Sequence, residues 1–278
     1  FKDYRRDIGK IVGIESDAKS LGMYDLPQNY AAEYPKVLDL IARKGLNISG
    51  PYQGMSTISG RTAINSFLTG LRQRSEKIDV ETGVSAKPTM IVDPLTWSGY
   101  QDSAHEIGIQ LVYSPTMDGH GLLQSPDGVR EAMEFVKNNP SLRLMGVNTI
   151  QPSNPTGLGV SPETLKEIAE ICAENNVFFN IDAFYSVIAQ DGVNILGLKE
   201  LQELPPEVLG KISVLVGETK ATDSQKKTAS MFWFAPEGHD AMAKSYMTAA
   251  KKVKGNWNAY ARPDEAITAA ALWSFPQG

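Results

Sequence analysis

The side chains of this chain that could do chemistry come directly after short apolar runs. They are an aromatic ring, an amide, a carboxylate with a nearby tyrosine, and a lysine: Trp97, Asn154, Asp182, Tyr185 and Lys220. Two further lysines, Lys226 and Lys227, have polar neighbours on both sides, whereas Lys220 comes three residues after an apolar run that ends in glycine. A buried lysine amine can hold a carbonyl cofactor covalently, and Lys220 is the best placed of the three for that role.

Each of these residues also has a purely structural interpretation. A tryptophan often packs in a core, and the sequence Asn-Pro-Thr-Gly at 154–157 has the composition of a turn. An aspartate at a strand end, such as Asp182, is commonly a helix cap, and a lysine after a strand usually lies in a solvated loop. The order of these residues along the chain and their chemical match favour one shared site over four unrelated features.

The elements that must position these residues are short strands that alternate with amphipathic helices. We expect strands at 89–93, 109–114, 144–150, 177–181, 212–217 and 229–235, and helices at 99–108 and 125–139. A further helix begins after Ser161, a favourable N-cap that is followed by proline at the first helical position. Its apolar residues recur with the spacing of one helix face, at Leu165, Ile168, Ala169 and Cys172.

Alternating strands and helices predict an α/β fold, with a mostly parallel, mixed central sheet and helices on both faces. In such a sheet, ligands bind outside the carboxyl ends of the strands. Since the polar and aromatic residues named above follow the predicted strands, we expect them to converge on one edge of the sheet.

The composition of the 278 residues is ordinary for a soluble globular protein, with 42% hydrophobic and 21% charged residues. A net charge of −5 argues against a general nucleic-acid binder, which normally has a basic face. The sequence has one cysteine, Cys172, and no apolar run of about 18 residues, so it predicts neither an intramolecular disulfide nor a membrane span. We therefore expect a cytoplasmic chain. Because the sequence starts without Met and stops directly after a helical pattern, we also expect a fragment or a processed form.

The order of the motifs resembles the fold-type-I enzymes that use pyridoxal 5′-phosphate (PLP), and among them the class I and II aminotransferases. SNPTG at 153–157 is followed by DAFY, which begins 28 residues after Asn154, and Lys220 comes 38 residues after Asp182. TISGRTAI at 57–64 is similar to the segment that opens the helix beneath the cofactor phosphate, and TWSGY at 96–100 is similar to the segment that carries the ring-stacking aromatic residue.

This resemblance runs from Tyr52 to Phe234. It implies an N-terminal segment over 1–50 and a large PLP-binding domain over 51–278, with the small C-terminal domain of the family missing or incomplete.

The resemblance implies a role for each residue around the cofactor ring. Lys220 is expected to form the Schiff base with PLP and then to act as general acid and base. Asp182 is expected to keep the ring nitrogen protonated, and Asn154 and Tyr185 to donate to the ring hydroxyl oxygen. Trp97 is expected to stack on the ring face.

The resemblance also implies a phosphate site at the start of a helix, made by Ser59, Gly60 and Arg61. These residues offer a hydroxyl, a close backbone approach and the positive end of a helix dipole. A capped helix without a ligand is the structural alternative for this segment.

The chain departs from the family pattern at two positions where phosphate ligands are usual. Family members usually have a serine three residues before the lysine and an arginine about eight after it, where this chain has Gly217 and Thr228. The hydroxyl of Thr219 is one candidate to compensate, and Lys226 or Lys227 could replace the arginine, although an ammonium lacks its bidentate fork. We include Thr219 and Lys227 among the expected cofactor-binding residues.

The function implied by the resemblance is the transfer of an amino group between an α-amino acid and a 2-oxo acid. The expected partners are these small molecules and, because the family usually places its active site at a two-fold interface, a second copy of the chain. The fold alone does not decide the reaction, so β-elimination, decarboxylation and oxidation stay open. A non-catalytic PLP-binding regulatory module is a third alternative, against which the retained Asp182, Tyr185 and Lys220 argue.

Overall fold

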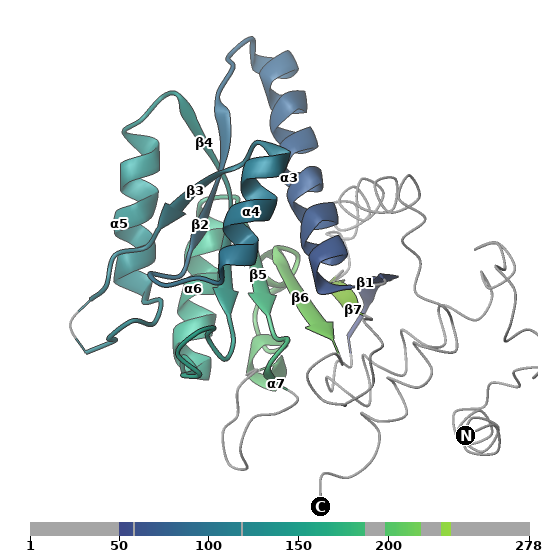
Figure 1. The fold of residues 1–278 in the computed structure, drawn as a ribbon, viewed down its shortest axis with the longest axis vertical. Coiled ribbons are helices and arrows are strands. Elements are labelled where there is room, and N and C mark those ends of the chain that lie inside the picture. Colours follow the sequence, from purple (N-terminus) through teal and green to yellow (C-terminus); the bar gives the residue numbers. More distant parts are fainter. Residues whose placement is uncertain (1–49, 58, 118, 187–197, 218–228, 235–278) are drawn as a thin grey trace, which may run out of the picture.

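The computed structural model describes residues 50–57, 59–117, 119–186, 198–217 and 229–234. These residues form one seven-stranded sheet with helices on both of its faces (Figure 1). The strands lie in the order β1-β7-β6-β5-β4-β2-β3. The mixed α/β sheet expected from the sequence is therefore confirmed.

The strands of the sheet, in chain order, are β1 Tyr52–Thr57, β2 Lys87–Val92, β3 Gln110–Tyr113, β4 Leu142–Ile150, β5 Phe178–Asp182, β6 Ile212–Gly217 and β7 Ala229–Phe234. Strands β3, β2, β4, β5 and β6 pair in parallel. Strand β7 pairs antiparallel with both of its neighbours, β6 and β1. The parallel strands end at the same edge of the sheet, which is the edge where ligands of α/β proteins bind.

The helices are α3 Gly60–Thr82, α4 Ser98–Ile107, α5 Pro126–Lys137, α6 Pro162–Glu174, α7 Leu198–Leu201 and α8 Pro206–Leu209. Ser125 and Ser161 cap α5 and α6, and in both helices proline follows the capping serine, as the sequence predicted for Ser161. The strands and helices expected from the sequence are present, with ends that differ by a few residues. Strand β1 and the short helices α7 and α8 were not predicted.

Two hydrophobic cores lie on opposite faces of the sheet. Apolar residues of α3 and α4, such as Phe67 and Leu71, pack on one face with Met90 and Phe178. Residues of α5, α6 and the α7–α8 segment pack on the other. Because both faces are covered, β5 and β6 are buried along their whole length, which explains their continuous apolar runs in the sequence.

A buried polar ladder crosses the three central strands. Asn148, Asn180 and Ser213 are neighbours in register on β4, β5 and β6. The Asn180 side-chain amide donates to Asn148 Oδ1 at 2.7 Å, and the Ser213 hydroxyl donates to Asn180 Oδ1 at 2.8 Å. All three side chains are fully buried, so these hydrogen bonds take the place of the hydrogen bonds to water that are lost on burial.

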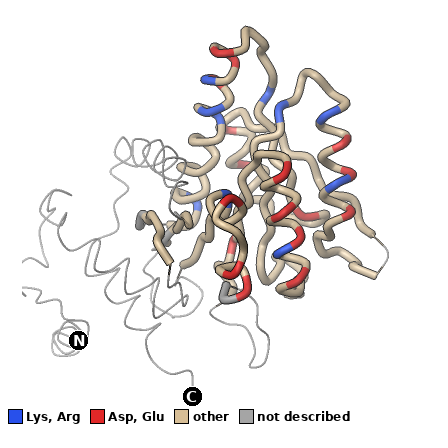
Figure 2. Tube along the Cα trace, turned by 180° about the vertical axis from the view of Figure 1, so that it is seen from behind, with Lys and Arg blue, Asp and Glu red and all other residues tan. Residues whose placement is uncertain are grey.

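Charged residues of both signs are interspersed along the outer surfaces of the helices (Figure 2). Arg130 of α5, for example, pairs with Asp127 on its own helix and with Glu167 on α6. Among the described residues, no helix is long and apolar enough to cross a membrane. The domain boundaries at 50 and 51 stay a prediction, since residues 1–49 and 235–278 lie outside the described residues.

Candidate functional site

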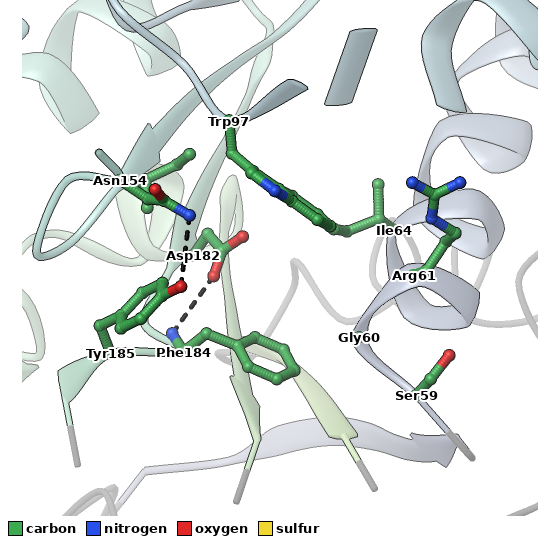
Figure 3. A pocket seen from close by; sticks show the side chains of 10 residues that line it. Ser59, Gly60, Arg61, Ile64, Trp97, Asn154, Asp182, Phe184 and Tyr185 are labelled. Atoms are coloured by element: carbon green, nitrogen blue, oxygen red, sulfur yellow. Dashed lines mark hydrogen bonds between the residues drawn. The ribbon is translucent and has the colours of Figure 1, made fainter. Parts of the chain in front are cut away.

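A pocket opens at the carboxyl edge of the sheet, beside the start of α3 (Figure 3). Its lining consists of Ser59, Gly60, Arg61, Ile64, Trp97, Ile150, Asn154, Asp182, Phe184 and Tyr185. Seven of these are residues that the sequence singled out: Ser59, Gly60, Arg61, Trp97, Asn154, Asp182 and Tyr185. Three further predicted site residues lie outside the described residues: Thr219, Lys220 and Lys227.

Asp182 is the last residue of β5 and places a buried carboxylate at the pocket floor. Its Oδ2 accepts the hydroxyl proton of Tyr100 at 2.8 Å, and its Oδ1 accepts the backbone N–H of Phe184 at 3.2 Å. Burial raises the pKa of Asp182 to about 6, although these two hydrogen bonds oppose the rise. At neutral pH this buried carboxylate is therefore mostly ionised.

Tyr100 contacts Asp182 and was not singled out from the sequence. It lies on the first turn of α4, has no solvent exposure, and packs edge-to-face on Trp97 with 6.3 Å between ring centroids. Burial and the charge of Asp182 raise the pKa of Tyr100 well above its usual value, so the hydroxyl stays protonated and donates. A signal was present, because Tyr100 lies three residues after Trp97 and hence on the same side of a helix.

Asp93 is a second buried carboxyl group beneath the pocket. It follows β2, and its Oδ2 accepts the backbone N–H of Ile150 at 2.9 Å, which ties the ends of β2 and β4 together. Burial raises the pKa of Asp93 to about 8; the bond from Ile150 opposes the rise, and the charge of Asp182 adds to it. Asp93 is therefore mostly protonated at neutral pH, whereas Asp182 is mostly ionised.

Asn154 and Tyr185 bring an amide and a phenol together on one side of the pocket. The Asn154 side-chain amide donates to the Tyr185 hydroxyl at 3.3 Å (Figure 3). Asn154 lies in the loop after β4, and the side chain of Gln151 braces that loop through two hydrogen bonds with the backbone of Val160. The two donors thus come from different strand ends and meet beside Asp182.

Trp97 and Arg61 form the opposite wall of the pocket. The guanidinium of Arg61 lies 6.0 Å from the centroid of the Trp97 ring and 3.4 Å from the carboxylate of Asp102. Both charged side chains are about half exposed, so water and salt screen their interaction. Trp97 therefore contributes a flat apolar ring to the pocket lining, with the Arg61 cation over that ring.

The start of α3 supplies backbone N–H groups at the mouth of the pocket. Ser59 is the N-cap of α3, and its hydroxyl oxygen accepts the N–H of Thr62 at 3.1 Å. The first turn carries no acidic residue, so nothing there neutralises the positive end of the helix dipole. This helix terminus is suited to bind an anion.

Phe184, a further residue that the sequence reasoning missed, points from the end of β5 toward the start of α3 (Figure 3). Its ring lies directly on two glycines. A Cβ built on Gly60 would come within 2.5 Å of the ring, and one built on Gly217 within 2.2 Å. Neither glycine could carry a side chain while the ring keeps this position.

Comparison with known proteins identifies the family that this arrangement belongs to. Residues 66–221, more than half of the chain, match the sequence model described as Aminotransferase class I and II. A curated relative, the probable aspartate/prephenate aminotransferase of Thermus aquaticus, is 22% identical over 168 residues. That match covers 59% of this chain and 39% of the relative, so the chain spans only part of the length of its relatives.

Solved structures share the fold. The N-succinyldiaminopimelate aminotransferase of Mycobacterium tuberculosis aligns with a TM-score of 0.68 at 17% identity, over 97% of this chain and 62% of that one. A PLP-bound C-S lyase of Staphylococcus hominis, in complex with L-cycloserine, aligns with a TM-score of 0.65 at 16% identity, over 98% of this chain and 58% of that one.

Proposed function

We propose that this chain, which belongs to the aminotransferase class I and II family, binds PLP and carries most of the active site of an aminotransferase. The reaction we propose is transfer of an amino group between an α-amino acid and a 2-oxo acid. The observation that supports it is the convergence at one pocket of a buried carboxylate, an amide–phenol pair, a flat aromatic ring and a helix N-terminus.

The donor set of the pocket fits PLP. Asp182 would face the ring nitrogen, where a carboxylate with a pKa of about 6 favours the protonated nitrogen at neutral pH. Asn154 and Tyr185 would donate to the ring hydroxyl oxygen, and Trp97 would cover one ring face. Ser59 and the first amides of α3 would hold the phosphate, with Arg61 nearby. When bound, PLP supplies an electron-accepting ring.

The residues of the chain would divide the remaining tasks. Tyr100 holds the Asp182 carboxylate through its hydroxyl, so the negative charge stays at a fixed position. We assign to Lys220 the covalent attachment of the cofactor, and afterwards the holding and release of a proton at Nζ.

The direct test is chemical fixation of the cofactor. Protein incubated with PLP is reduced with borohydride, digested and mapped by mass spectrometry. We expect one adduct, on the peptide that contains Lys220, and its loss in Lys220→Ala. Lys226→Ala is the matched control and should keep the adduct. Absence of an adduct in the unmodified protein, or an adduct on Lys226 or Lys227 alone, would overturn the proposal.

A second test separates transfer from other reactions on the same scaffold, because the C-S lyase of similar fold belongs to a different reaction class. The PLP-loaded protein is mixed with a panel of amino acids in the absence of a 2-oxo acid. Transfer predicts release of the 2-oxo acid and retention of the amino group by the cofactor. Release of ammonia and a thiol from a sulfur amino acid would instead indicate a lyase.

We also propose that the working protein is a homodimer, on the basis of its family. Light scattering on the purified protein measures the mass directly. A dimer mass at micromolar concentration is the expected result, and a monomer mass for protein that binds PLP would contradict it.

A further inference from the structure

Phe184 occupies an unusual place between the two halves of the pocket. Its backbone N–H donates to Asp182 Oδ1 at 3.2 Å, so the start of its side chain is tied to the carboxylate at the pocket floor. Its ring extends away from Asp182 toward Gly60 on α3 and also lines the pocket (Figure 3). The ring therefore stands between the part of the pocket that holds Asp182 and the start of α3.

The ring takes the space of a side chain at position 217. A Cβ on Gly217 would meet Cε1 and Cζ of Phe184 at 2.2 and 2.3 Å, and a Cβ on Gly60 would meet Cζ at 2.5 Å. Non-bonded carbon atoms do not approach this closely. If position 217 or 60 carried a side chain, either the backbone there or the Phe184 ring would therefore have to move. Gly217 is buried at the end of β6, where the backbone pairing with Ala229 leaves it little freedom to shift.

This packing gives a physical reason for the glycine at 217, because the ring occupies the space that a side chain at this position would need. A large residue at 184 and a glycine at 217 fill the same volume that a smaller residue and a serine would fill. The exchange changes the chemistry of the wall, because a phenyl ring cannot donate a hydrogen bond and a serine hydroxyl can. The donors that the described residues offer to an anion then come from the α3 side, at Ser59 and the first helical amides.

We propose that Phe184 is a specificity-determining residue that sets how strongly this pocket selects a phosphorylated ligand. The Phe184–Gly217 pair leaves this wall apolar, so a phosphate group gains less binding free energy here than it would gain beside a serine at 217. This inference deepens the proposed function and rests on it for the identity of the ligand, but the contact between the ring and position 217 stands independently.

The test is a double-mutant cycle with two ligands, PLP and pyridoxal, which lacks the phosphate. The variants are Gly217→Ser, Phe184→Ala, Phe184→Ala/Gly217→Ser and, as the control for the hydroxyl, Phe184→Ala/Gly217→Ala. Absorbance titration gives each dissociation constant, and the ratio of the pyridoxal constant to the PLP constant measures selection for the phosphate. Phe184→Leu replaces Phe184→Ala throughout if the alanine variant does not fold.

We expect the serine to add selectivity only when the ring is absent. Phe184→Ala/Gly217→Ser should exceed Phe184→Ala/Gly217→Ala in the ratio by about tenfold, the effect of one hydrogen bond to a charged group. Gly217→Ser alone should weaken the binding of both ligands and leave the ratio within about twofold of the unmodified protein. If Gly217→Ser alone raises the ratio as much as it does beside Phe184→Ala, the ring does not control this position and the proposal is wrong.

A second readout does not depend on the ligand. In cofactor-free protein, Gly217→Ser should lower the melting temperature in the presence of Phe184, and Phe184→Ala should remove most of that loss. Equal losses in both backgrounds would overturn the steric part of the inference. Failure of the proposed function looks different: no absorbance change with either ligand and no adduct on Lys220, while the coupling between 184 and 217 in the melting temperature persists.

Discussion

The two ends of the pocket are built in different ways. The carboxylate end, which consists of Asp93, Tyr100 and Asp182, is buried and held by hydrogen bonds of 2.8 to 3.2 Å. The helix end, which consists of Ser59, Gly60 and Arg61, is partly exposed and offers a hydroxyl, backbone amides and one screened cation. The carboxylate end offers a ligand the full charge of a buried side chain, and the helix end offers mainly the partial charges of groups that lie close to water.

The two ends should therefore respond differently to substitution, to pH and to salt. A charge in a buried site interacts strongly and responds to pH, because few water molecules screen it. A half-exposed cation contributes little and responds to salt. Substitutions at the carboxylate end should therefore have large, pH-dependent effects, and substitutions at the helix end small, salt-dependent ones.

The largest effect is expected from Asp182→Asn. The amide keeps the shape of the side chain but removes the negative charge that would favour a protonated ring nitrogen. We expect kcat for the amino-acid half-reaction to fall by about 10²- to 10³-fold, the usual range for the loss of one preorganised electrostatic contact. Stopped-flow absorbance measures the half-reaction. An effect below tenfold would contradict the comparison, because the buried end would then be no more sensitive than the exposed one.

The stability of the cofactor-free protein should fall as the pH rises from about 4 to 8. Asp93 and Asp182 have folded pKa values of about 8 and 6, above the usual 3.8, so the unfolded state loses their protons first. Ionisation therefore favours unfolding, by about 1.4 kcal/mol per pH unit for each group between its unfolded and folded pKa. The decline should be steepest between pH 4 and 6 and should level off above pH 8.

Urea unfolding of the unmodified protein and of Asp93→Asn at several pH values isolates one of these groups. The difference in the free energy of unfolding between the two proteins should change by about 1.4 kcal/mol per pH unit between pH 5 and 7. Equal slopes in the two proteins would show that Asp93 titrates near its usual pKa and is not desolvated.

A smaller effect is expected from Tyr100→Phe, which removes the hydroxyl that donates to Asp182. Since that hydrogen bond opposes the rise in the pKa of Asp182, its loss should move the acid limb of the pH–rate profile to higher pH. We expect kcat at pH 7 to fall about tenfold, in keeping with one hydrogen bond to a charged group. A uniform fall at every pH, with no shift of the acid limb, would instead indicate a general packing defect.

The smallest effects belong to the helix end. Arg61→Ala should weaken PLP binding by less than about fivefold, in the range of an exposed ion pair, and the loss should shrink further in 0.5 M salt. Asp102→Asn frees Arg61 from its partner and should strengthen PLP binding by a similar or smaller factor. Opposite signs for the two variants would support a weak, screened contribution of Arg61 to PLP binding, and a hundredfold loss in Arg61→Ala would contradict it.

The arrangement of strands and the strand-end residues could be predicted from the sequence because they follow local rules. Apolar runs alternate with capped amphipathic helices, and the residues after parallel strands meet at one edge. Trp97, Asn154, Asp182 and Tyr185 were found in this way and line one pocket. Their assignment to cofactor atoms stays a prediction.

The contacts around these residues could not be predicted, because they depend on side chains far apart in the sequence. Tyr100 reaches Asp182 across 82 positions, and the ring of Phe184 lies between glycines that are 157 residues apart, Gly60 and Gly217. The glycine at 217, where the family resemblance implied a serine, was visible in the sequence, but the ring packed against it was not. Strand β1 was missed for a similar reason: its pairing partner, β7, lies at the other end of the described chain.

The polar ladder across β4, β5 and β6 has a consequence for the accuracy of the pocket. The surrounding strands are apolar on both faces, so sliding β5 by two residues would keep every side chain on its face and cost little in hydrophobic contacts. The same slide would move Asp182 by roughly 7 Å, far enough to break its hydrogen bond with Tyr100. Asn148, Asn180 and Ser213 prevent it, because only the observed register pairs all three. These three side chains thus fix the register of the central strands, and with it the position of Asp182 in the pocket, although none of them lines that pocket.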